Sequence, residues 1–96
     1  MYAAALRVEL RIPNVHSLKE KRSKVRALKT MLTTKFPVAV AEVGFQDQWQ
    51  RSTFGVAAVA PQAGQLQRLL HSVERALRAR PEIEVLECAT SYLEER

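Results

Sequence analysis

An alternation of apolar and charged side chains marks the first predicted element. Apolar residues occupy every second position from Leu6 to Ile12, and charged residues occupy the positions between them. A period of two predicts a β-strand that buries one face and exposes the other. Pro13 ends this strand, because proline has no backbone N–H to donate to a neighbouring strand.

The next segment has helical periodicity and a clear start. Ser17 and Glu20 have the spacing of a capping box, in which each side chain accepts a hydrogen bond from a free N–H group of the first turn. Pro37 stops the pattern, since the residue before a proline avoids helical backbone angles. We therefore predict a helix over residues 17–35. Its apolar positions are Leu18, Val25, Leu28, Leu32 and Phe36.

Two further strands follow, at residues 38–43 and 51–60, with a polar, turn-like stretch between them. The second of these strands is apolar or small on both faces, which is typical of a central strand. The short connection predicts that the two strands form a hairpin.

A second helical pattern lies between Pro61 and Pro81, and a last strand includes Ile83 and Val85. We expect the residues beyond that strand to be frayed or loosely docked. The apolar face of the second helix consists of Leu66, Leu69, Leu70, Val73, Ala76 and Leu77.

The predicted order is therefore βαββαβ, in a single domain over residues 1–96. Right-handed crossovers place both helices on one face of a four-stranded antiparallel sheet. This is the α+β ferredoxin-like arrangement, in which the strands that begin the two βαβ units lie in the middle.

The other face of this sheet has no helix to cover it. It is too apolar to stay exposed, and it lacks the paired aromatic residues with which an RNA-recognition sheet stacks bases. Phe54 falls on the helix side by alternation. We therefore expect a homodimer that buries this face rather than a nucleic-acid surface. Its residues include Ala39, Ala41, Val43, Thr53, Gly55, Ala57 and Val59.

Composition narrows the class of protein. Hydrophobic residues make up 47% of the chain and charged residues 26%, as in ordinary globular domains. The sequence contains no signal-peptide pattern and no apolar run near the roughly 20 residues of a membrane helix, so we expect no membrane association. The single cysteine, Cys88, excludes an internal disulfide and fits a reducing compartment. The expected location is the cytoplasm.

Positive charge is concentrated in the first helix. Residues 16–36 contain five lysines and two arginines against one glutamate, a net +6, whereas the whole chain is +5. Four cations lie on one flank of the helix, where neighbours three and four residues apart repel one another. An anionic partner would relieve that repulsion, while the alternative is a solvated face. We expect these four residues, together with Lys21, to contact phosphates: Lys19, Arg22, Arg26 and Lys29.

Four other residues near this flank or near the turn are candidates for contacts. Lys21 falls on the core side of the helix, either as a lysine whose stem covers apolar surface or as a fifth phosphate contact. His16 precedes the cap and could add an edge contact. Trp49 and Arg51 lie in or beside the polar turn, where the tryptophan could pack internally, at a subunit interface or against a base.

Signals of catalysis are weak. Cys88 follows Glu84 and Glu87, which disfavour a thiolate. The histidines and the cysteine lack metal-ligand spacing. Glu42 and Asp47 could approach one another across the hairpin, but many carboxylate pairs could do so. We expect neither an enzyme nor a cofactor or metal.

Two stretches of the sequence resemble a known family. The first is Ser17-Leu18-Lys19-Glu20-Lys21-Arg22 after Ile12-Pro13, and the second is Ala41-Glu42-Val43, Gln46-Asp47, Trp49-Gln50-Arg51 and Gly55-Val56-Ala57. The chain is similar to the YlxP-like family of small bacterial proteins, a domain of unknown function. The resemblance implies a ferredoxin-like fold and genes often found beside those for transcription, translation initiation and ribosome maturation.

We therefore expect a non-enzymatic RNA- or ribosome-associated binding module that uses its basic first helix. The alternative is a dimeric protein-interaction or small-ligand module with no nucleic-acid role.

Overall fold

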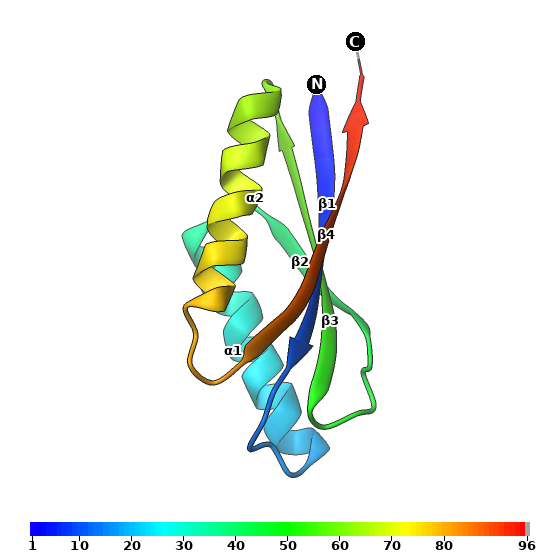
Figure 1. Ribbon diagram of the computed structural model, residues 1–96, viewed down its shortest axis with the longest axis vertical. Helices are drawn as coiled ribbons and strands as arrows, with labels where there is room; N and C mark the ends of the chain where they lie inside the picture. The colour runs from blue at the N-terminus through cyan, green and yellow to red at the C-terminus, as the bar shows by residue number, and fades with distance from the viewer. Residues whose placement is uncertain (96) are drawn as a thin grey trace.

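The computed structural model describes residues 1–95 and contains four strands and two helices (Figure 1). All neighbouring strands are antiparallel, in the order β2-β3-β1-β4. The ferredoxin-like prediction is confirmed, including the central position of the two strands that begin the βαβ units. The elements are β1 (Tyr2–Arg11), α1 (Leu18–Lys35), β2 (Ala39–Gly44), β3 (Arg51–Ala60), α2 (Ala63–Arg78) and β4 (Glu84–Glu94).

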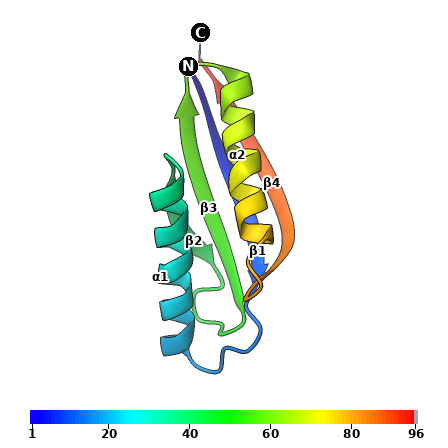
Figure 2. The same cartoon turned by 90° about the vertical axis from the view of Figure 1, so that its left-hand side faces the viewer.

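Both helices lie on one side of the sheet, which faces the viewer in Figure 2. Helix α1 packs against β2, and α2 packs against β1, β3 and β4. The period of two in β1 and β3 places alternate apolar side chains under the helices. Phe54 is fully buried on this side, as its position in β3 predicted.

The start of α1 follows the predicted cap with one difference. Ser17 Oγ accepts a hydrogen bond from the backbone N–H of Glu20 at 3.1 Å. The Glu20 carboxylate accepts from the N–H of His16, at 3.0 Å, and not from that of Ser17. At the other end, the Phe36 N–H donates to the Leu32 carbonyl before Pro37 ends the helix.

The prediction of a frayed C-terminal segment is wrong. Strand β4 pairs with β1 from end to end, with a register shift between Glu9 and Leu10. The Met1 amino group donates to the Glu95 carbonyl, and the Glu95 N–H donates to the Met1 carbonyl, each at 2.9 Å. Because β4 is an edge strand with most side chains exposed, its sequence lacks the alternation that marks a half-buried strand.

The sheet face without helices, here called the open face, exposes large apolar side chains. Val59, Leu93 and Val43 are 65%, 63% and 52% exposed. Between them a floor of alanines forms a shallow hollow of about 490 Å³ near Val59 and Leu93. No helix among residues 1–95 is long and apolar enough to cross a bilayer.

Candidate functional site

Four of the predicted phosphate-binding residues lie together on α1. We call them the basic flank: Lys19, Arg22, Arg26 and Lys29. The first three are exposed and Lys29 is half-buried. Within residues 1–95, no ion pair or hydrogen bond involves any of their charged groups. The basic flank therefore keeps its full capacity to bind an anion.

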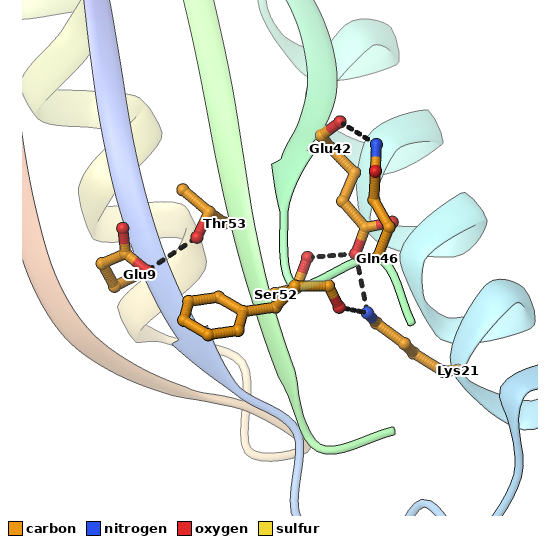
Figure 3. A network of polar contacts seen from close by, with 7 residues as sticks. Glu9, Lys21, Glu42, Gln46, Ser52 and Thr53 are labelled. Atoms are coloured by element: carbon orange, nitrogen blue, oxygen red, sulfur yellow. Dashed lines mark hydrogen bonds and ion pairs between the residues drawn. The ribbon is translucent and has the colours of Figure 1, made fainter. Parts of the chain in front are cut away.

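Lys21 has a different environment from its neighbours on the helix. Its side chain is only 1% exposed, and its Nζ lies 3.0 Å from Glu42 Oε2 and donates to the Phe45 carbonyl (Figure 3). A buried ammonium is costly unless it is paired and hydrogen-bonded. The direct phosphate contact that we expected of Lys21 is therefore not available, because its charge is compensated inside the protein.

The partner of Lys21 belongs to a network that fixes the β2–β3 loop. Ser52 Oγ donates to Glu42 Oε2 at 2.6 Å, and Gln46 Nε2 donates to the Glu42 carbonyl at 3.2 Å (Figure 3). Phe45, whose carbonyl binds Lys21, has a φ of 57° in the left-handed region. Lys21 thus holds this strained loop residue against α1.

A cleft of about 400 Å³ lies between α1 and the β2–β3 loop. One wall is the basic flank from Arg22 to Lys29, and the other is the end of β2 and the β2–β3 loop, with the carboxylates of Glu42 and Asp47. The two stretches that resemble a known family therefore meet across one cavity. The lining residues are Lys21, Arg22, Val25, Arg26, Lys29, Glu42, Gln46 and Asp47.

The acidic wall of this cleft was not among the predicted site residues. The sequence contained a signal for it, because Glu42 precedes the predicted turn and Asp47 lies within it. The turn alone does not show which helix it faces, since the two walls come from separate parts of the chain. The structure brings both carboxylates to the cleft, whereas the sequence indicated only that they could approach one another across the hairpin.

The three predicted edge residues are spread out. Trp49 is 49% exposed in the β2–β3 loop. The Arg51 guanidinium stacks over the Phe45 ring, 4.6 Å from its centroid, and lies 3.9 Å from Glu9 Oε2. These contacts hold Arg51 between a loop residue and the sheet, and Arg51 does not line the cleft. His16 is exposed before the cap and has its backbone N–H on Glu20.

A second polar cluster lies at one end of the open face. Glu9 Oε2 accepts a hydrogen bond from Thr53 Oγ1 at 2.7 Å (Figure 3). The guanidinium groups of Arg7 and Arg51 each approach the Glu9 carboxylate to 3.9 Å. The charge of Glu9 is thus compensated by its own sheet.

Two features of residues 1–95 bear on reactivity, the Cys88 thiol and the possible metal ligands. Burial, and after it the nearby Glu74 carboxylate, raise the pKa of the Cys88 thiol to about 11. A thiol with this pKa is almost entirely protonated at neutral pH. Among residues 1–95, no group of three or more His, Cys, Asp or Glu side chains could hold a metal ion.

Comparison with known proteins places this geometry in a family. Residues 3–90 match the family model described as "Protein of unknown function (DUF503)". The chain belongs to this family. It is also 43% identical over 68 residues to "Uncharacterized protein YlxP" of Bacillus subtilis (strain 168), covering 71% of this chain and 74% of that protein. The family match includes α1 and the β2–β3 loop, and hence both walls of the cleft, and it confirms the resemblance drawn from the sequence.

Proposed function

We propose that this protein binds RNA through the basic flank of α1, as a binding module and not as an enzyme. The observation that carries the proposal is the set of four cations on one side of α1 without partners among residues 1–95. A polyanion is the partner that compensates such a row most completely.

The spacing of the four cations supports this proposal. Lys19 and Arg22, Arg22 and Arg26, and Arg26 and Lys29 are three or four residues apart, so each pair repels on the helix surface. Lys19 and Arg22 also lie in the first turns, where the helix dipole disfavours positive charge. Each of these arrangements reduces helix stability by a few tenths of a kcal/mol. A bound phosphate would attract the same cations, so the unfavourable contribution would become a favourable one.

Phosphate contacts position an RNA without reading its sequence. Four such contacts predict that the logarithm of the association constant falls with the logarithm of salt concentration with a slope of roughly −3. Titration of ribosomal RNA fragments at several salt concentrations tests this. Binding that is absent at low salt, or that does not depend on salt, would contradict the proposal.

We also propose a second property, homodimerisation through the open face. Here the observation is the exposure of Val59, Leu93 and Val43 beside a floor of alanines. Cross-strand neighbours on this face form three rows. They are Val59, Ala3 and Leu93; then Ala39, Ala57, Ala5 and Ser91; then Ala41, Gly55, Arg7 and Ala89.

The arrangement of large and small side chains on the open face fits a second copy of the same face. A two-fold axis along the middle row would place the large Val59 and Leu93 of one copy over the small Gly55 and Ala89 of the other. Alternation of large and small residues is how packed layers interlock. The three rows, from Ala3 to Arg7 across four strands, cover roughly 320 Å² of flat sheet, from ~4.8 Å between strands and ~3.3 Å per residue.

An interface of that size is clearly smaller than a typical stable interface, which buries roughly 800 Å² per partner. We therefore expect a reversible dimer. Sedimentation over a range of protein concentrations should show a monomer–dimer equilibrium, and Ala57→Arg, in the middle row, should shift it to monomer. A monomer at every concentration would exclude this interface, and with it the alternative of a dimeric module without a nucleic-acid role.

A further inference from the structure

The cleft between α1 and the β2–β3 loop has walls of opposite charge, and among residues 1–95 only the Lys21–Glu42 ion pair joins them. Arg22, Arg26 and Lys29 stand on the α1 wall, and Asp47 and Glu42 on the loop wall. Among residues 1–95, no ion pair joins these three cations to the two carboxylates. The volume of about 400 Å³ falls within the range of sites for small organic groups.

The two carboxylates of the cleft differ in how far they are free to accept further hydrogen bonds. Glu42 Oε2 already accepts from Ser52 and pairs with Lys21. Asp47 makes no side-chain hydrogen bond or ion pair within residues 1–95, so both of its oxygens can accept. The Lys21 network holds this loop beside α1, which keeps Asp47 at the cleft before any ligand binds.

A ligand for this cleft must present an anion to one wall and N–H donors to the other. A nucleotide does both, with its phosphate and its base. Among the four RNA bases, guanine alone presents two adjacent N–H donors on its Watson–Crick edge, and they match the two oxygens of one carboxylate. Unpaired bases in loops are recognised on this edge.

We infer that the cleft binds an unpaired guanosine of RNA, with Asp47 accepting from guanine N1–H and the 2-amino group and with Arg22, Arg26 and Lys29 on the adjoining phosphates. This inference rests on the proposed RNA binding and adds base selectivity to it. A free guanine nucleotide presents the same base edge and a phosphate. The test must therefore distinguish binding to RNA from binding to a free nucleotide.

The test uses RNA hairpins that differ at one loop position, which is guanosine, inosine or adenosine. Inosine lacks only the 2-amino group of guanine. The full chain should bind the guanosine hairpin roughly tenfold more tightly than the adenosine hairpin, with inosine between them. Free guanosine monophosphate should compete only weakly, since it offers one phosphate where the hairpin offers several.

The matched variants are Asp47→Asn and Glu87→Gln, which remove the same charge from the cleft and from β4. Asp47→Asn should bring the three affinities to within about twofold while RNA binding persists, and Glu87→Gln should keep the preference for guanosine. Far-UV circular dichroism and thermal melts establish that both variants fold.

Two results would overturn the inference and leave the proposed function standing. One is equal binding of all three hairpins by the unmodified protein. The other is a guanosine preference that survives in folded Asp47→Asn. If free guanosine monophosphate bound as tightly as the guanosine hairpin, the ligand of the cleft would be a free nucleotide and not RNA. Absence of binding to every hairpin at low salt would instead contradict the proposed function itself.

Discussion

On the open face, Glu9 forms hydrogen bonds or ion pairs with three side chains. On the basic flank of α1, the charged groups of four cations have no such partner among residues 1–95. The two regions belong to the same small domain and are built from equally regular elements. At Glu9 the charges contribute to the fold, because each is compensated by a neighbour on the sheet. The basic flank has no such structural use, so its charges point to a partner outside the chain.

Lys21 and Arg22 repeat this contrast at adjacent positions. Lys21 is buried and paired with Glu42, and Arg22 is exposed and unpaired within residues 1–95. A helix turns by about 100° per residue, so neighbours in sequence face different surroundings. Substitutions at the compensated positions should therefore affect stability, and those on the basic flank should affect binding.

The largest effect on stability should come from Lys21→Met. This change leaves Glu42 with a charge that has lost its ammonium partner, and removes the hydrogen bond to the Phe45 carbonyl. Removal of one member of a buried pair typically reduces stability by about 3 kcal/mol. Urea unfolding of the variant measures this. Unchanged stability would show that the network does not hold the loop.

A double variant makes that result more specific. Adding Glu42→Gln to Lys21→Met removes the unpaired carboxylate and should restore part of the lost free energy of unfolding. If the double variant is as unstable as the sum of the two single variants, the pair is not coupled.

A smaller loss is expected at the open face. Thr53→Val removes the hydroxyl that donates to Glu9, but Arg7 and Arg51 still compensate the carboxylate. We expect a loss of about 1.5 kcal/mol, at the low end of the usual contribution of one hydrogen bond to a charged group. The same urea assay measures it. A loss as large as that of Lys21→Met would contradict the difference between the two sites.

The smallest effect on stability, and with the opposite sign, is expected at Arg26→Gln. This variant removes one member of two repelling pairs, with Arg22 and Lys29, and keeps a residue that favours helix. The free energy of unfolding should rise by about 0.3 kcal/mol at low salt and converge with that of the unmodified protein at high salt. A clear loss of stability would mean that Arg26 has a structural partner.

Much of this molecule could be predicted from local patterns in the sequence. Alternation gave β1 and β3, and a cap and a proline bounded α1, because these signals depend on residues within a few positions of one another. The length of β4 was missed, since an exposed edge strand needs no alternation. The core-side position of Lys21 was found from the helical wheel, but its partner Glu42 was not, since that contact depends on how the hairpin returns to α1. The cleft was missed for the same reason.

The central claim is that the basic flank serves RNA binding and not folding. The most direct measurement compares Arg22→Glu/Arg26→Glu with a control of equal charge change, Arg68→Glu/Arg75→Glu, on exposed positions of α2. Each double variant receives a thermal melt and an RNA titration over a salt series. We predict that the α1 variant keeps its stability within about 1 kcal/mol. The slope of the logarithm of its RNA association constant against the logarithm of salt concentration should become shallower by roughly two units. Its affinity for RNA should be much lower than that of the control. Equal RNA binding by the two folded variants would contradict the account.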